Sequence, residues 1–280
     1  MSLFQPSELM NFLESIGRKP NKTLSQNFLV DGNILRKIIQ SANIKKGDLV
    51  LEIGPGPGAL TEAILLAGAR VIAVEKDSVF AKHLPRLSSE DRFLEVHEED
   101  ILEFDIPAAL KNHLSKGEKA KVIANLPYHL TSPIFDKLLP LSDLIDEVIV
   151  MIQKEVAIRI CSKKGSKDYS SFSIFCQLYS DPEYLFSVSP NCFYPKPNVT
   201  SAIIRCKLTH RDLNLNKLDF VKFIKKLFGT RRKMITSTLK DTYAQDKVIS
   251  SLQSLGLNIK SRPEELSIDE LINFYQSLNL

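Results

Sequence analysis

The residues best suited to chemistry in this 280-residue chain form one tetrapeptide, Asn125-Leu126-Pro127-Tyr128. The Asn125 amide oxygen and the Leu126 carbonyl can accept hydrogen bonds from the two N–H groups of an aromatic amine, which aims the nitrogen lone pair at an electrophile. Pro127 stiffens the turn because it fixes φ and has no N–H. Tyr128 offers a ring on which a base can stack, worth about 1–3 kcal/mol. Taken alone, the tetrapeptide could also be an ordinary turn after a strand.

A glycine-rich turn lies upstream, at residues 52–58, with the sequence Glu-Ile-Gly-Pro-Gly-Pro-Gly. Glycines let the backbone approach a ligand closely, and the start of the following helix supplies free N–H donors. A nucleoside cofactor is the expected guest. The run Gly54-x-Gly56-x-x-Ala59, with Glu75 about 20 residues further on, also satisfies the dinucleotide fingerprint. The loop alone therefore fits both NAD and S-adenosylmethionine.

Three acidic residues favour S-adenosylmethionine as the cofactor. Glu52 gives the pattern E-x-G-x-G-x-G, which is typical of class I methyltransferases. Glu75 ends the next expected strand and could accept both ribose hydroxyls, and Asp100 follows the third strand and could accept from the adenine amino group. Glu75 and Asp100 could instead only cap helices. Both fall at the carboxyl ends of strands, however, where ligands of open α/β sheets bind.

A second aromatic residue, Phe193, begins the proline-rich run 193–201. We expect it to cover the face of an adenine that Tyr128 leaves open, as enzymes that modify extruded bases require; packing in the core is the alternative. The five histidines show no metal-binding spacing and the four cysteines form no C-x-x-C pair. We therefore expect no metal and free thiols in a reducing compartment.

The elements that must position these residues follow an α/β pattern. Short apolar runs alternate with amphipathic stretches of helical length between residues 48 and 152, which predicts a parallel sheet with crossover helices. The strands are expected at residues 49–53, 70–74, 92–96, 121–124 and 147–152, and two more, at 183–188 and 200–208, should close the sheet as an antiparallel hairpin. This gives a Rossmann-like, class I methyltransferase fold with a seven-stranded, mostly parallel sheet.

Two domains are expected. Residues 1–209 form the S-adenosylmethionine-binding catalytic domain, and residues 210–280, where the periodicity becomes wholly helical, form a small all-helical domain. Net charge is only +4, but seven basic residues and no acidic one lie between residues 222 and 240. Such a run is often only a solvated face, although a concentrated positive charge also suits nucleic acid.

Taken together, the motifs resemble the KsgA/Dim family of ribosomal RNA adenine N6,N6-dimethyltransferases. They occur in the family's order over residues 22–266: Lys-Thr-Leu-Ser-Gln-Asn-Phe-Leu at 22–29, the glycine loop, Asn125 to Tyr128, Gln-Lys-Glu-Val at 153–156, the run 193–201, Phe-x-x-Arg-Arg-Lys at 228–233 and Arg-Pro-Glu-Glu-Leu at 262–266. Ser25, where glycine is common, and Ser237, where asparagine is common, depart from the pattern.

The resemblance implies specific roles. Asn27 and Leu29 should contact the cofactor beside Gly54, Glu75, Asp100 and Asn125. Arg231, Arg232 and Lys233 should contact RNA phosphates, so that binding weakens with salt. The implied substrate is a pair of adjacent adenines in the 3′-terminal hairpin of 16S small-subunit ribosomal RNA, each dimethylated within a pre-assembled small ribosomal particle, with a role in small-subunit biogenesis.

Two rival functions stay open. Antibiotic-resistance methyltransferases of large-subunit ribosomal RNA share the glycine loop and Asn-x-Pro-Tyr, although the segments at 228–233 and 262–266 favour the small-subunit family. A non-catalytic nucleic-acid-binding factor that kept the fold is the other, and the intact tetrapeptide and acids argue against it. No run approaches the roughly 18 apolar residues of a membrane span, and the acidic N-terminus does not suit a signal peptide. We expect a cytoplasmic protein that is a monomer and has no membrane partner.

Overall fold

The computed structural model describes residues 3–19, 27–211 and 213–279. The chain folds into two compact units, one formed by Met1–Ala157 and Asp181–Thr209 and the other by Ile158–Ser180 and His210–Leu280. The second unit includes Ile158–Ser180 as well as the residues from His210 onward, whereas the sequence analysis assigned residues 1–209 to one domain and residues 210–280 to the other. In the motif at residues 22–29, only positions 27–29 lie among the described residues, and Ser25 lies outside them.

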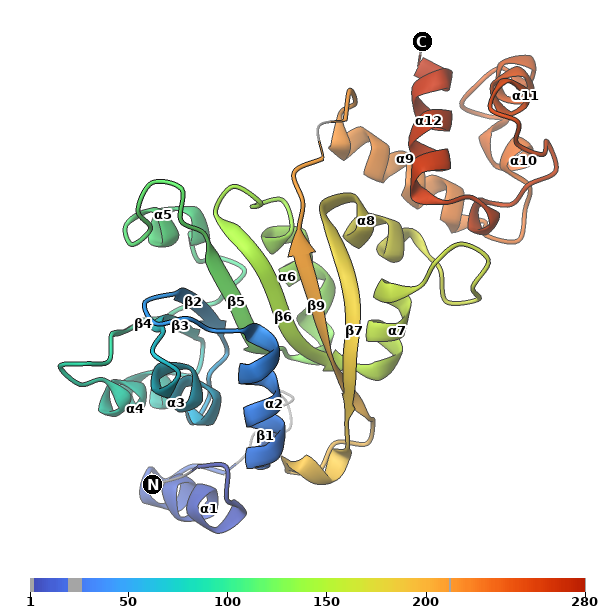
Figure 1. The fold of residues 1–280 in the computed structure, drawn as a ribbon. Helices are drawn as coiled ribbons and strands as arrows, with labels where there is room; N and C mark the ends of the chain where they lie inside the picture. Colours follow the sequence, from blue (N-terminus) through green and yellow to red (C-terminus); the bar gives the residue numbers. More distant parts are fainter. Residues whose placement is uncertain (1–2, 20–26, 212, 280) are drawn as a thin grey trace. The chain divides into compact units, whose positions relative to one another are not determined.

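A seven-stranded sheet forms the first unit, with the strand order β4-β3-β2-β5-β6-β9-β7 (Figure 1). Strands β4, β3, β2, β5 and β6 pair in parallel and β9 pairs antiparallel to β6. The strands are β2 (Leu49–Ile53), β3 (Arg70–Glu75), β4 (Leu94–Glu98), β5 (Ala120–Asn125), β6 (Ile145–Gln153), β7 (Ser180–Val188) and β9 (Ser201–Leu208). The predicted seven-stranded, mostly parallel sheet is confirmed, and β4 lies two residues later than expected.

Two short strands that the sequence did not predict form a separate pair. β1 (Phe28–Leu29) runs antiparallel to β8 (Phe193–Tyr194), with Phe28 opposite Tyr194 and Leu29 opposite Phe193. Successive side chains of a strand point to opposite faces. The pairing therefore fixes which of these four side chains enter the core.

The helices of the first unit are α1 (Pro6–Ser15), α2 (Gly32–Ala42), α3 (Ala59–Leu66), α4 (Ser78–His83), α5 (Ile106–Lys111), α6 (Thr131–Leu138) and the start of α7 (Lys154–Cys161). Its 3-10 turns are η2 (Leu84–Leu87), η3 (Tyr128–Leu130) and η4 (Pro190–Cys192). No helix in the described part of the chain is long and apolar enough to cross a membrane.

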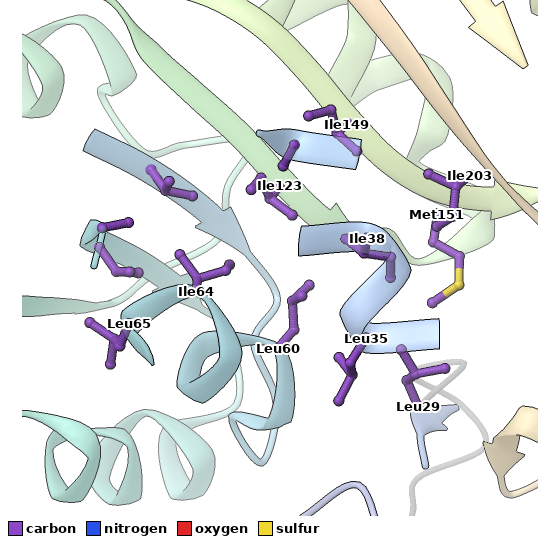
Figure 2. Close-up of a cluster of buried hydrophobic side chains, with 14 of the residues drawn as sticks. Leu29, Leu35, Ile38, Leu60, Ile64, Leu65, Ile123, Ile149, Met151 and Ile203 are labelled. Atoms are coloured by element: carbon purple, nitrogen blue, oxygen red, sulfur yellow. The ribbon is translucent and has the colours of Figure 1, made fainter. Parts of the chain in front are cut away.

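One hydrophobic core joins α2 and α3 to a face of the sheet (Figure 2). Strand residues at alternate positions, such as Ile149 and Met151 of β6, point to this face. Leu35 and Ile38 of α2 and Ile64 of α3 belong to the same buried cluster. Burial of each such side chain contributes about 1.5–3 kcal/mol. Because the glycine turn lies between β2 and α3, this packing also fixes where the turn begins and ends.

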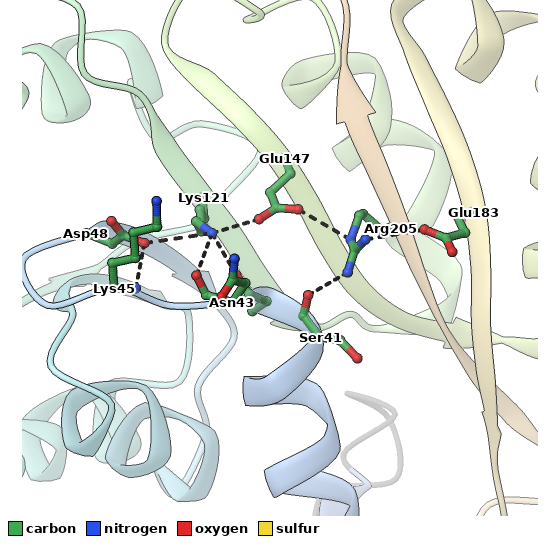
Figure 3. Close-up of polar contacts among 9 residues, drawn as sticks. Ser41, Asn43, Lys45, Asp48, Lys121, Glu147, Glu183 and Arg205 are labelled. Atoms are coloured by element: carbon green, nitrogen blue, oxygen red, sulfur yellow. Dashed lines mark hydrogen bonds and ion pairs between the residues drawn. The ribbon is translucent and has the colours of Figure 1, made fainter.

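Two cations hold the last turn of α2 against the sheet (Figure 3). Lys121 Nζ donates to the Ala42 carbonyl at 2.6 Å and to Glu147 Oε1 at 2.8 Å. Arg205 Nη2 donates to the Ser41 carbonyl at 2.6 Å, and its Nε lies 3.4 Å from Glu147 Oε2. The last carbonyls of a helix have no partner within the helix and carry partial negative charge. The two cations therefore satisfy them and fix α2 relative to β5 and β9.

The second unit is helical apart from the start of β7. It contains the end of α7, α8 (Ser171–Tyr179), α9 (Lys217–Gly229), α10 (Ile235–Leu239), α11 (Gln245–Ser254), η5 (Pro263–Glu265) and α12 (Ile268–Asn279). Aromatic rings of α9 and α12 contact each other, with Phe223 and Tyr275 centroids 5.0 Å apart. The predicted helical C-terminal region is confirmed.

Replacing Lys121 with methionine should destabilise the protein, because it leaves the largely buried Glu147 carboxylate and the Ala42 carbonyl without this cation. We expect the free energy of unfolding to fall by about 2–3 kcal/mol, less than for a wholly buried pair because Arg205 remains beside Glu147. Urea titration measures the effect. The exposed neighbour Lys119 provides the control, since Lys119→Met should change stability by less than about 0.5 kcal/mol. Equal stabilities of the two variants would contradict the role given to Lys121.

Candidate active site

A pocket of about 180 Å³ opens at the carboxyl ends of β2, β3, β4 and β5. Parallel pairing brings these strand ends to one edge of the sheet, with Ile53 beside Val74 and Glu75 beside Glu98. Ligands of open α/β sheets bind at this edge. The lining residues are Asn27, Phe28, Ile53, Gly54, Gly56, Val74, Glu75, Lys76, Asp77, Glu99, Asp100, Ile101 and residues 125–130.

The glycine turn needs its glycines for two separate reasons. Gly54, Gly56 and Gly58 all have positive φ, at 64°, 55° and 96°, a region that side chains disfavour. A Cβ on Gly58 would also lie 2.7 Å from Leu87 Cδ1, and one on Gly56 would lie 3.2 Å from the Phe28 ring. The turn thus brings bare backbone to the pocket wall, and α3 begins immediately after it.

The Glu75 carboxylate joins the glycine turn to the end of β3. Its Oε2 accepts a hydrogen bond from the Gly56 N–H at 2.8 Å, and its Oε1 accepts one from the Asp77 N–H at 2.8 Å. Burial raises the pKa of Glu75 above its usual value, and these two N–H donors act against that rise. Each carboxylate oxygen has a second lone pair. Glu75 can therefore hold the turn and still accept ligand hydroxyls.

Asp100 follows β4, the strand beside β3, and it is paired with a cation. Lys76 Nζ is 2.7 Å from Asp100 Oδ2, and Asp100 Oδ1 accepts from the Leu102 N–H at 2.9 Å. The hydrogen bond from Lys76 is the main reason that the pKa of Asp100 lies below its usual value. Asp100 is therefore an ionised acceptor, and because Lys76 is largely exposed its ammonium can swing into water when a ligand donor approaches.

Glu52 is a buried acid without a normal partner. Its side chain is 1% exposed, and neither carboxylate oxygen accepts a hydrogen bond of normal geometry from the described residues. Burial raises its pKa from 4.5 to about 8, with nearby Thr61 lowering it slightly and Glu75 raising it further. Glu52 lines a second, smaller pocket of about 50 Å³ that shares Gly54 and Asn125 with the first. An electropositive ligand group there would lower the pKa of Glu52 and pair with its ionised form.

The tetrapeptide lies where β5 ends at the pocket. Asn125 Nδ2 donates to the Asn27 carbonyl at 3.1 Å, which leaves its Oδ1 as the end of the amide able to accept from a ligand. The Leu126 N–H donates to the Met151 carbonyl at 3.1 Å. Pro127 follows with φ −58°. The backbone of this segment is thus tied to β6, which fixes the position of the Leu126 carbonyl.

Tyr128 and Phe193 do not face each other across the pocket. Tyr128 lines the pocket, and its hydroxyl lies 2.7 Å from Ser201 Oγ, which orients the ring. Burial raises the pKa of Tyr128, so the phenol stays neutral at physiological pH. Phe193 is 4% exposed and packs in the core with Leu29, outside the lining of the pocket. The position of its ring matches the core-packing alternative.

The remaining predicted site residues divide between two places. Asn27, Gly54, Glu75, Asp100 and Asn125 line the main pocket, and Leu29 lines the smaller one. The basic residues Arg231, Arg232 and Lys233 lie in the helical unit. Among the described residues no cluster of three or more histidine, cysteine, aspartate or glutamate side chains could hold a metal ion.

Sequence reasoning missed several pocket residues. Phe28, Lys76 and Asp77 line the pocket. Asp77 caps α4 by accepting from the Val79 N–H at 3.0 Å, and it pairs with Arg18 at 2.9 Å. The order Asp77-Ser78 before a helix is a capping signal that the sequence offered. The pairing with Arg18 had no local signal, because 59 residues separate the two.

Comparisons with known proteins agree with one another. A family model for ribosomal RNA adenine dimethylase matches residues 17–280. The ribosomal RNA small subunit methyltransferase A of Protochlamydia amoebophila is 46% identical over 278 residues, covering 99% of this chain and 98% of that protein. The protein of the same name from Chlamydia muridarum is 43% identical over 275 residues, covering 97% and 96%.

Two solved structures share the fold. A dimethyladenosine transferase from Plasmodium falciparum superposes with a TM-score of 0.77 at 24% identity, covering 90% of this chain and 97% of that one. The 23S rRNA methyltransferase ErmE superposes with a TM-score of 0.69 at 24% identity, covering 91% of this chain and 100% of that one. Both extend over the sheet and the helical C-terminal region.

Glu52 should make the unliganded protein less stable as pH rises. Because its folded-state pKa is about 8 against 4.5 for a free carboxyl, the unfolded chain loses this proton before the folded one does. Between pH 4.5 and pH 8 the contribution of Glu52 to the free energy of unfolding falls by about 1.4 kcal/mol per pH unit, and above pH 8 it stays constant. Glu52→Gln should remove this pH-dependent contribution to the free energy of unfolding. The stability of the variant relative to the native protein should therefore increase as pH rises from 5 to 8.

Urea unfolding at several pH values measures the difference, with the exposed Glu90→Gln as the matched control. Parallel pH profiles for Glu52→Gln and the native protein would contradict the assignment.

Proposed function

The chain belongs to the ribosomal RNA adenine dimethylase family, and from this premise we propose that it uses S-adenosylmethionine to dimethylate the N6 amines of two adjacent adenines in the 3′-terminal hairpin of 16S ribosomal RNA. The observation that carries the proposal is the meeting of Asn125 and Tyr128 with Glu75, Asp100 and the glycine turn in one pocket. The first two residues suit an aromatic amine, and the others suit a nucleoside cofactor.

The chain's residues fit S-adenosylmethionine. Glu75 has lone pairs for ribose hydroxyls, and Asp100 is an ionised acceptor for the adenine amino group once Lys76 turns aside. The smaller pocket brings the unpaired Glu52 side chain next to Gly54, where a ligand ammonium group would favour the ionised form of Glu52 and pair with it. Asn27 and Leu29 complete the walls. When bound, the cofactor supplies an electrophilic methyl group.

The tetrapeptide prepares the nucleophile. The Asn125 Oδ1 and the Leu126 carbonyl accept the two N–H groups of the target amine, which turns its lone pair out of conjugation with the ring. The bond from Asn125 Nδ2 to the Asn27 carbonyl holds the amide in the orientation this needs. Tyr128 stacks on the base, and its bond to Ser201 keeps the ring in place. The amine proton leaves to water after the C–N bond forms, so no side chain must act as a strong base.

Small-subunit ribosomal RNA is favoured over large-subunit RNA by the extent of similarity. Relatives named for the small subunit are 43–46% identical over nearly the whole chain, whereas the 23S enzyme ErmE is 24% identical. We further propose that the protein acts in the cytoplasm as a monomer, on a pre-assembled small ribosomal particle. In this view residues 1–209 carry the chemistry and residues 210–280 hold ribosomal RNA.

Incubation with labelled S-adenosylmethionine and undermethylated small ribosomal particles should yield dimethylated adenines at adjacent positions near the 3′ end, mapped by reverse transcription. Asn125→Ala should reduce kcat by about 100-fold, because the amine is no longer positioned, while RNA binding changes little. Exposed Asn112→Ala serves as the control and should match the native enzyme.

Methyl transfer only to large-subunit RNA would overturn the proposed substrate. A collapse of RNA affinity in Asn125→Ala, with kcat intact, would overturn the role of Asn125.

A further inference from the structure

A lysine-bearing segment of the helical unit is held in place by the C-terminal part of the chain. Residues 162–169, called the lysine loop below, connect α7 to α8 and carry Lys163, Lys164 and Lys167. The Gly165 N–H donates to the Glu264 carbonyl at 2.8 Å. At the loop's end, the buried Tyr169 ring meets the Phe228 ring edge-on, with centroids 6.0 Å apart. An exposed loop is thus fixed at its middle and at its end.

Arg231 completes this attachment. Its Nε donates to the Glu264 carboxylate, its Nη1 to the Lys167 carbonyl, and its Nη2 to the Ser166 carbonyl at 3.0 Å. All three nitrogens of the guanidinium therefore bind groups of the same unit. The rigid, planar fork of arginine suits this arrangement. Arg231 is consequently turned toward the loop backbone, whereas the family resemblance implied a phosphate contact for it.

Two acids near the loop, Glu264 and Glu270, are paired, and four cations are left exposed. Lys164 Nζ lies 2.8 Å and 3.0 Å from the two Glu270 oxygens, and Glu264 is bound by Arg231. Exposed side chains without an ion-pair partner among the described residues are Lys163, Lys167, Arg232 and Lys233. Arg231 binds the Lys167 carbonyl and directly precedes Arg232 and Lys233 in the sequence. The two loop lysines therefore lie near Arg232 and Lys233. These four cations outnumber Asp168, the one acid within the loop, so the surface carries a net positive charge.

We propose that Arg231 is a positioning residue that orders the lysine loop, and that Lys163 and Lys167 of this loop bind ribosomal RNA phosphates beside Arg232 and Lys233, for which the family resemblance already implied such contacts. This inference rests on the proposed function and names the part of the helical unit that contacts the substrate. Phosphate is the fitting ligand group, because exposed ammonium and guanidinium groups on a fixed backbone bind a polyanion without reading its bases. Ordering the loop beforehand spares the entropy that a mobile loop would lose on binding.

The binding surface is tested by the salt dependence of particle binding. We expect Lys163→Gln with Lys167→Gln to weaken binding of undermethylated small ribosomal particles at least about tenfold. The slope of log K against log salt should become shallower by up to about 2, since each lost phosphate contact removes about 0.7–0.9. Exposed lysines elsewhere in the unit, Lys247→Gln with Lys260→Gln, match the change of charge and should leave the slope unaltered.

The role of Arg231 needs a readout made without RNA. Arg231→Ala and Arg231→Lys should both speed trypsin cleavage after Lys163 and Lys167 severalfold. Alanine has no side-chain donor, and the single nitrogen of lysine cannot span the acceptors that the three separate guanidinium nitrogens reach. Arg232→Ala should weaken particle binding and leave cleavage in the loop unchanged. Circular dichroism would verify that each variant remains folded. If Arg231→Ala fails to fold, the milder change Arg231→Lys still tests the role.

The outcomes separate the two proposals. If the native protein does not methylate small-subunit RNA, the proposed function fails. If it does, and the lysine double variant keeps the native salt slope, the phosphate surface is wrong; weaker binding with an unchanged slope would point to a ribosomal protein as the contact. Unchanged trypsin cleavage in folded Arg231 variants would overturn the positioning role.

Discussion

The two hydrogen bonds accepted by the Glu75 carboxylate set the geometry of the pocket. One comes from the Gly56 N–H in the glycine turn and the other from the Asp77 N–H at the start of α4. Asp77 in turn caps α4 and pairs with Arg18 of the N-terminal segment. Glu75 therefore joins the glycine turn to the connection between β3 and α4, and through Asp77 it also reaches the N-terminal segment that carries Arg18. The cost of burying its charge, visible as a raised pKa, is offset by N–H donors that a ligand does not have to displace.

Much of this arrangement could be predicted from the sequence, because local signals specify it. Apolar runs of strand length predicted the sheet, and the ends of those strands placed Glu75, Asp100 and Asn125 at one edge. The glycine pattern predicted a close approach of the backbone, and the positive φ of Gly54 and Gly56 agrees with it. These features depend on where strands end and on the residues of a turn. Both are determined by a few residues that are neighbours in the sequence.

Features that depend on distant pairing were out of reach. The pairing of Leu29 with Phe193 and of Phe28 with Tyr194 joins segments more than 160 residues apart, and it turns Phe193 into the core. Sequence reasoning left both a stacking role and a core position open for this residue. The prediction for the basic residues 231–233 was limited in the same way. Charge alone cannot distinguish Arg231, whose guanidinium binds a loop of its own unit, from its exposed neighbours.

The central claim, that this pocket holds S-adenosylmethionine through Glu75, is tested most directly by calorimetric titration of the free protein with S-adenosylmethionine and with NAD. The native protein should bind one S-adenosylmethionine and no NAD. Glu75→Gln should weaken that binding at least about tenfold, as expected for losing a charged hydrogen-bond acceptor, whereas the exposed Glu98→Gln should bind as the native protein does. Binding of NAD in place of S-adenosylmethionine, or undiminished affinity in Glu75→Gln, would contradict the account.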